Sequence, residues 1–117
     1  MANRSANRRS PRPRTAAVLT ALADPTRRSV LEALRKRPLA VNEIAARLPI
    51  SRPAVSQHLR VLERAQLVRG EKAGTRRLYS AEPRGLLELQ RYLQTYWGDA
   101  LRAFQAAAQA TEGEEKE

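Results

Sequence analysis

The segment that decides the fold is residues 41–65, which read VNEIAARLPISRPAVSQHLRVLERA. Its first part, residues 42–48, has apolar side chains at helical spacing, and Pro49 then interrupts the pattern. Ser51 is a favourable residue at the start of a helix, and a second helix is predicted from there to about Ala65. Two short helices joined by a tight turn are typical of a helix-turn-helix unit.

The second of these helices has one apolar face and one polar face. Val55, Leu59 and Leu62 fall on one narrow stripe, which predicts the buried side. The residues that point away from this stripe are Pro53, Ser56, Gln57, Arg60 and Arg64. Hydroxyl, amide and guanidinium groups are the ones that read base edges and bind phosphates. A solvated surface helix has the same pattern, so the interpretation as a DNA-reading helix depends on the segments around it.

A β-hairpin is predicted directly after this helix. Residues 67–72 and 76–80 have strand-like patterns, and Gly74 lies in the turn between them. The cations around the tip of the hairpin are Lys72, Arg76 and Arg77. A basic hairpin in this position lies along the sugar–phosphate backbone or enters the minor groove. The whole unit is therefore predicted to be a winged helix-turn-helix.

Further helices are predicted on both sides of this unit. One covers residues 15–23, and another starts at Asp24-Pro25 and extends to about Arg37. Pro83 opens the last helix, which reaches about Ala110. Its apolar residues, at spacings of three and four, are Leu86, Leu89, Leu93, Trp97, Leu101 and Phe104. The predicted fold class is mainly α with a small β-hairpin, in the order α-α-α-α-β-β-α.

The last helix is longer than this domain can cover. About 28 residues span roughly 40 Å, so its second half is expected to bury against another copy of the chain. The natural partner is the first helix, and the fold is expected to be dimeric through the first and last helices. Two-fold symmetry places two recognition helices roughly 34 Å apart, which predicts a palindromic operator. The residues expected at the dimer interface are Val18, Leu19, Leu22, Leu93, Trp97, Leu101 and Phe104.

The composition excludes several other functions. The 117 residues include no cysteine and one histidine, which excludes disulfides and thiolate metal sites. Twenty-two Lys and Arg against 12 Asp and Glu give a net charge of +10, which favours an anionic partner. No paired carboxylates, nucleophile–base pair or glycine-rich phosphate loop stands out, so we expect no enzyme and no cofactor. The longest apolar run has four residues, so we expect a cytoplasmic protein without a membrane segment.

Three segments are expected along the chain. Residues 1–14 are basic and are predicted to be a disordered arm, either merely solvated or adding non-specific attraction to phosphates. Residues 15–110 form the winged helix-turn-helix DNA-binding and dimerisation domain. Residues 111–117 form an acidic tail that is expected to be frayed.

The ordered motifs resemble those of a known family. Residues 23–28, ADPTRR, are similar to the opening of the ArsR/SmtB family of bacterial winged-helix transcriptional regulators. Residues 39–45 are similar to its supporting helix, 51–62 to its recognition helix, and 65–68 with 74–79 to its strand and wing. The resemblance covers about residues 15–105. It implies a homodimer that binds an imperfect inverted repeat in double-stranded DNA and usually acts as a repressor.

The metal response of that family carries over poorly. The best-known thiolate site needs a cysteine pair in the supporting helix, where this chain has residues 41–45, VNEIA. Another site uses histidine and carboxylates on the last helix, where this chain has Glu88 and Asp99 without histidine. Carboxylates alone bind borderline transition metals weakly, so no metal site is expected. The alternatives are a nickel or zinc response through a weak carboxylate and His58 site or through an effector-sensing partner protein, and a winged-helix module that binds protein or RNA.

The DNA-binding residues can be assigned by chemistry. Phosphate contacts are expected from Arg52, Arg60, Lys72, Arg76 and Arg77. Base readout is expected mainly from Ser56 and Gln57, because a glutamine amide fits the N6/N7 edge of adenine. Arg52 and His58 are further candidates for base readout. His58 lies on the flank of the helix, where packing is the alternative to a contact with DNA.

Overall fold

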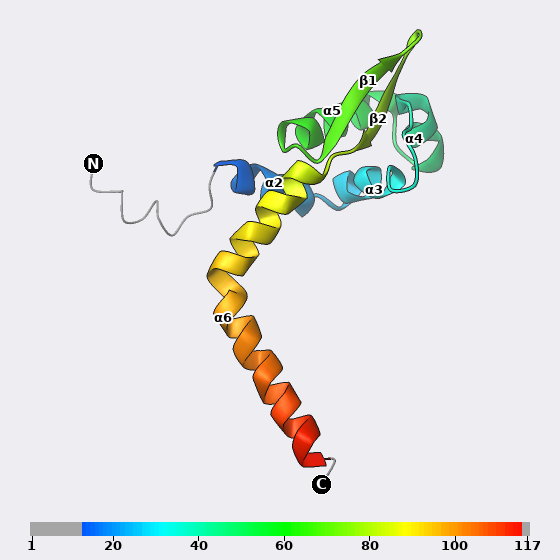
Figure 1. Ribbon diagram of the computed structural model, residues 1–117. Coiled ribbons are helices and arrows are strands. Elements are labelled where there is room, and N and C mark those ends of the chain that lie inside the picture. Colours follow the sequence, from blue (N-terminus) through cyan, green and yellow to red (C-terminus); the bar gives the residue numbers. More distant parts are fainter. Residues whose placement is uncertain (1–12, 116–117) are drawn as a thin grey trace, which may run out of the picture.

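The computed structural model describes residues 13–115 of the chain. Its elements follow the order predicted from the sequence (Figure 1). They are α2 (Pro13–Ala23), α3 (Pro25–Ala33), α4 (Val41–Arg47), α5 (Arg52–Arg64), β1 (Val68–Ala73), β2 (Arg76–Ala81) and α6 (Pro83–Glu115). The hairpin and α6 extend in opposite directions from the helical part of the domain (Figure 1). No helix in the described part of the chain is both long and apolar enough to cross a membrane.

The corner between α2 and α3 is held by the sequence ADPTRR. The Asp24 carboxylate accepts a hydrogen bond from the Arg27 N–H at 3.0 Å and caps α3, and Pro25 occupies its first turn. The Arg27 Nε donates to the Ala21 carbonyl at 2.7 Å, and the Arg28 Nη1 donates to the Leu22 carbonyl at 2.6 Å. These guanidinium groups satisfy carbonyls that the end of a helix leaves free. Both arginines therefore serve the fold.

The helix α3 is shorter than predicted. It ends at Ala33, whereas the sequence pattern indicated an end near Arg37. The Leu34 N–H bonds to the Leu31 carbonyl at 3.1 Å, which tightens the last turn. This turn places Leu34 in the core, where it is buried. The helix thus ends at this turn, before Pro38 is reached.

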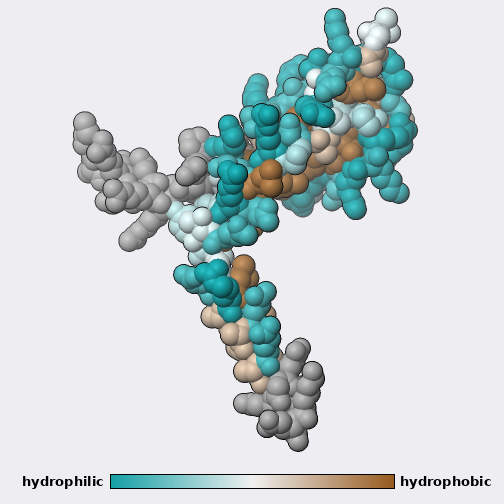
Figure 2. Space-filling model, in the orientation of Figure 1, coloured by the Kyte–Doolittle hydropathy of each residue, from teal (hydrophilic) through white to brown (hydrophobic). Residues whose placement is uncertain are grey.

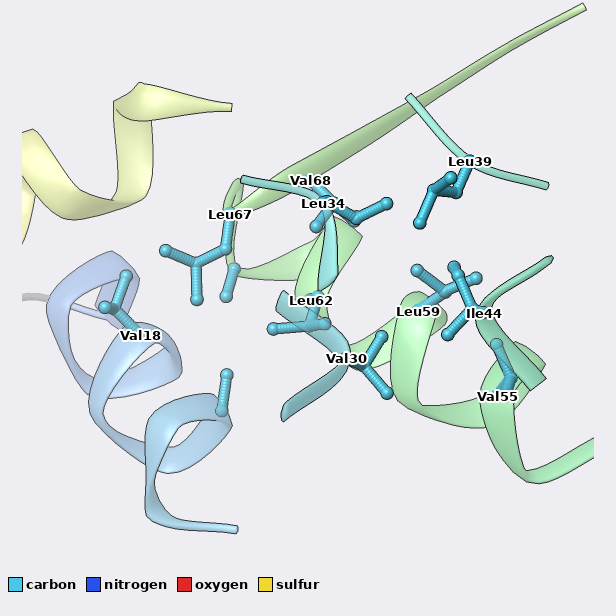
Figure 3. Close-up of a cluster of buried hydrophobic side chains, with 12 residues drawn as sticks. Val18, Val30, Leu34, Leu39, Ile44, Val55, Leu59, Leu62, Leu67 and Val68 are labelled. Carbon is cyan, nitrogen blue, oxygen red and sulfur yellow. The ribbon is translucent and has the colours of Figure 1, made fainter. Parts of the chain in front are cut away.

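The helix-turn-helix forms as the sequence predicts. The Ser51 hydroxyl accepts the Ala54 N–H at 3.2 Å and caps α5. Val55, Leu59 and Leu62 are buried, which confirms the predicted stripe. They join apolar side chains from α2, α3, α4 and β1 in one core (Figure 3). This core fixes which face of α5 points outward.

Val18 belongs to this core. It was expected at the dimer interface, but it is fully buried within its own chain. The reason is that α2 turns this side chain toward the helical domain, while the neighbouring Leu19 remains exposed. Val18 is therefore not available to a second copy.

The hairpin is fixed at its base to the helix-turn-helix. The strands β1 and β2 are antiparallel, with Gly70 opposite Tyr79, and Gly74 has a φ of 68° in the turn. The Leu39 N–H donates to the Tyr79 carbonyl at 2.9 Å, and the Tyr79 N–H donates to the Leu39 carbonyl at 2.8 Å. The connection between α3 and α4 thus pairs with the outer side of β2.

The helix α6 starts on the domain and then leaves it (Figure 1). The Gly85 N–H donates to the Gln66 carbonyl at 2.9 Å, and a Cβ on Gly85 would collide with the Ala65 carbonyl oxygen. The helix packs against α2 and continues to Glu115, beyond the predicted end at Ala110. Its 33 residues span about 50 Å.

Both expected boundaries of the domain are affected. The helix α2 begins at Pro13, inside the predicted basic arm, and α6 includes residues 111–115 of the predicted acidic tail. The rest of the arm and of the tail, residues 1–12 and 116–117, lies outside the described residues.

Candidate nucleic-acid interface

The outward face of α5 carries the predicted reading residues. Gln57, Arg60 and Arg52 are exposed, and Ser56 and His58 are half-buried. Burial of the opposite stripe holds these side chains on the solvent side of the helix. The face therefore offers amide, hydroxyl and guanidinium groups at the positions predicted from the helical period.

Arg52 connects the two helices of the motif. Its Nη1 donates to the Asn42 Oδ1 at 3.3 Å, so a cation from the first turn of α5 lies next to the first turn of α4. Sequence reasoning did not select Asn42, although an exposed amide on the supporting helix was a signal for it. The first helix of such a motif crosses the DNA backbone, so Asn42 joins the candidate phosphate contacts.

His58 lies toward the start of α3. The pKa of the Asp24 carboxyl is lowered first by the hydrogen bond from the Arg27 N–H, and to a smaller extent by the charges of Arg27 and His58. The histidine is thus within electrostatic range of the residue that caps α3. A half-buried position on the flank of α5 is compatible both with packing at the helix edge and with a contact with DNA, so both alternatives remain open.

The arginines of the wing have partners within the protein. The Arg76 Nη2 lies 2.6 Å from the Glu43 Oε1, and the Arg37 Nη1 lies 3.3 Å from the Glu43 Oε2. The pKa of the Glu43 carboxyl is lowered first by the hydrogen bond from the Ala40 N–H, and then by the two arginines. Sequence reasoning selected Arg76 but missed Glu43 and Arg37, because 33 residues separate the paired side chains Glu43 and Arg76.

Arg77 and Lys72 complete the wing. The Arg77 guanidinium carbon lies 5.7 Å from the centre of the Tyr79 ring, a cation–π distance. A Cβ on Gly70 would overlap the side chains of Arg77 and Tyr79, so the glycine makes room for this stack over β1. Lys72 faces Arg77 across the hairpin, and both are exposed. The wing thus presents cations next to α5.

A second surface lies on α6, away from the hairpin. Trp97, Leu101 and Phe104 are 55%, 56% and 73% exposed, and Leu93 is also exposed. Hydrophobic residues continue along the protruding part of this helix (Figure 2). On α2, Leu19 is exposed and Leu22 is half-buried. Large apolar side chains exposed together along one helix are typical of a protein interface.

The described residues form no cluster that matches a metal site. Among the side chains that the structure describes, those of residues 14–111, no three of His, Cys, Asp or Glu lie close enough together to hold an ion. Glu88 and Asp99, the acids considered on the last helix, lie within i,i+3 reach of Arg91 and Arg102, respectively.

The sequence is similar to known transcriptional regulators. A family model described as a helix-turn-helix domain matches residues 22–71. The chain is 54% identical to the HTH-type transcriptional regulator Rv2034 of Mycobacterium tuberculosis over 84 residues. The matched stretch covers 72% of this chain and 78% of that protein. It is 35% identical to the transcriptional repressor SdpR of Bacillus subtilis over 63 residues, and this matched stretch covers 54% of this chain and 70% of that protein.

The fold is similar to solved structures of the same kind. An ArsR-like transcriptional regulator from Rhodococcus sp. RHA1 has a TM-score of 0.69 and 32% identity, over 83% of this chain and 92% of that chain. A second similar structure is the homodimeric winged helix-turn-helix DNA-binding domain Mb0332 of Mycobacterium bovis, a possible ArsR-family regulator. It has a TM-score of 0.59 and 27% identity, and the match covers 77% of this chain and 83% of that chain. These comparisons confirm the predicted fold class, and the names describe regulators rather than enzymes.

Proposed function

Because the chain belongs to the ArsR/SmtB family of winged-helix transcriptional regulators, it is a DNA-binding transcriptional regulator, and we propose that it is a homodimeric repressor of an inverted-repeat operator. The observation that carries the proposal is that the exposed face of α5 lies beside a wing whose Arg76 forms an ion pair with Glu43 of α4, in the same helix-turn-helix. Bound across a promoter in the bacterial cytoplasm, such a dimer occludes it from polymerase.

The contacts with DNA divide by chemistry. Base readout comes mainly from Gln57 and Ser56, because α5 is the helix that enters the major groove. Phosphate contacts come from Arg52, Arg60, Lys72, Arg76 and Arg77, with Asn42 as an addition. Arg52 and the half-buried His58 on the flank of α5 are further candidates for base readout.

The dimer forms through the protruding half of α6 and the exposed side of α2. The large apolar side chains that remain exposed on α6 are Leu93 (43%), Trp97 (55%), Leu101 (56%) and Phe104 (73%). On α2, the exposed Leu19 and the half-buried Leu22 add to this apolar surface. The homodimeric description of the similar Mycobacterium bovis domain supports a dimer, and the exposed apolar residues support its placement on these helices. The hairpin and α6 extend away from each other (Figure 1), so an interface on the protruding half of α6 lies apart from the wing.

Selection of duplexes from a random-sequence pool tests the proposal. We expect the enriched sites to contain two inverted half-sites with centres about one helical turn apart, and footprinting to show both protected. Mass analysis of the complex should give two chains per duplex. Enrichment of a single half-site, or of no sequence, would contradict the proposed dimeric recognition.

A further inference from the structure

Glu43 joins three segments of the chain at one carboxylate. Its Oε1 accepts the Ala40 N–H at 3.0 Å, which caps α4, and it also contacts Arg76 of β2. Its Oε2 contacts Arg37, in the connection between α3 and α4. The side chain of Glu43 is 30% exposed, whereas Arg76 is 57% exposed. A partly covered acid thus lies between two more exposed cations.

This contact acts on the tip of the wing rather than on its attachment. The base of the hairpin is already fixed by the two backbone hydrogen bonds between Leu39 and Tyr79. Arg76 is the first residue of β2, next to the turn at Gly74. Loss of the Glu43 charge therefore leaves the hairpin attached and releases the guanidinium of Arg76.

The same contact reduces the positive charge that the wing presents. Arg37 and Arg76 carry two charges, and the Glu43 carboxylate cancels one of them. Contacts with phosphate supply essentially all of the affinity for random DNA, which grows with the number of phosphates neutralised. Specific affinity also depends on base contacts, which come from α5.

We propose that Glu43 is a positioning residue that raises DNA specificity. It holds Arg76 in one orientation and withholds one positive charge, so that random-sequence binding is weakened more than operator binding. On the operator, contacts from α5 align the duplex with the orientation in which Arg76 is held. On random DNA no such alignment exists, and a restrained arginine reaches fewer phosphates. This inference rests on the proposed function.

The test is Glu43→Gln in the full chain, measured by fluorescence anisotropy on a selected operator and on a scrambled duplex. The amide keeps an oxygen for the Ala40 N–H but removes the charge. The salt slope is the slope of the logarithm of the binding constant against the logarithm of the salt concentration. On scrambled DNA we expect this slope to be steeper by about 0.9, so that roughly 3.5-fold more affinity is lost between 50 and 200 mM salt. The ratio of operator to scrambled affinity should fall about two- to fivefold. An unchanged slope and ratio would overturn the inference.

Two further variants separate the causes. Asp99→Asn changes the net charge by the same amount on the protruding part of α6, and it should leave the slope unchanged. Glu43→Asp keeps the charge but withdraws the carboxylate, so it should keep the slope and lower the ratio. If Glu43→Gln does not fold, an unchanged ratio in Glu43→Asp overturns the positioning role. A wild-type protein that does not prefer its operator would instead refute the proposed function.

Discussion

Truncation of Trp97 should dissociate the dimer. A tryptophan side chain buries about 200 Å² when it is covered, and 55% exposure leaves roughly 110 Å² for a partner. At about 25 cal/mol per Å², this area is worth ~2.7 kcal/mol for each protomer, or ~5 kcal/mol for the dimer. If the partner covers only half of it, Trp97→Ala still costs ~2.7 kcal/mol and raises the dimer Kd about 100-fold.

Sedimentation equilibrium of the full chain measures this effect. Gln94→Ala is the matched control, because Gln94 is an exposed polar residue of the same helix and its truncation removes far less apolar surface than the loss of an indole. We expect Trp97→Ala to be monomeric at concentrations where the wild type and Gln94→Ala are dimers. An unchanged Kd for Trp97→Ala would refute the assignment of α6 to the dimer interface.

Three other perturbations test the DNA surface and the charged contacts of the fold. Gln57→Ala should cost about 1–3 kcal/mol on the operator and little on scrambled DNA, as measured by competition binding; equal losses on both would make Gln57 a positioning residue. Arg77→Ala should weaken binding to all sequences alike and flatten the salt slope by about one unit, and a loss confined to the operator would contradict the wing assignment. The pKa values of Asp24 and Glu43 are lower in the folded chain than in the unfolded chain. At a pH above the unfolded-state pKa values the two carboxylates therefore add to the stability of the fold, and this contribution is lost as the pH falls through the folded-state pKa values. Urea unfolding should therefore show a falling free energy of unfolding below about pH 4, and a double Asp24→Asn, Glu43→Gln variant with the same pH dependence would contradict this origin.

Local signals in the sequence predicted most of the fold. Asp24-Pro25 and Ser51 marked the starts of α3 and α5, because capping side chains act within three residues of their own position. The helical period predicted the buried stripe of α5 and hence its outward face. These features depend on neighbours in the chain, so the sequence contains them directly.

Features that depend on distant contacts were missed. The pair of Glu43 and Arg76 forms only because the hairpin lies beside α4. The helix α3 ends in a turn at Leu34, which is buried in the core, whereas the apolar spacing alone indicated a longer helix. Val18 and Leu19 are adjacent apolar residues of α2, and only the packing shows that the first is buried and the second exposed.

Affinity for a selected operator, compared with a scrambled duplex of the same length, tests the central claim most directly. The measurement is fluorescence anisotropy of the wild-type chain across a salt series. Specific recognition by α5 predicts an operator affinity at least about a thousandfold tighter than the scrambled one at physiological salt. Equal affinities with a steep salt slope would show only electrostatic attraction to phosphates, and would contradict the claim that this protein reads sequence.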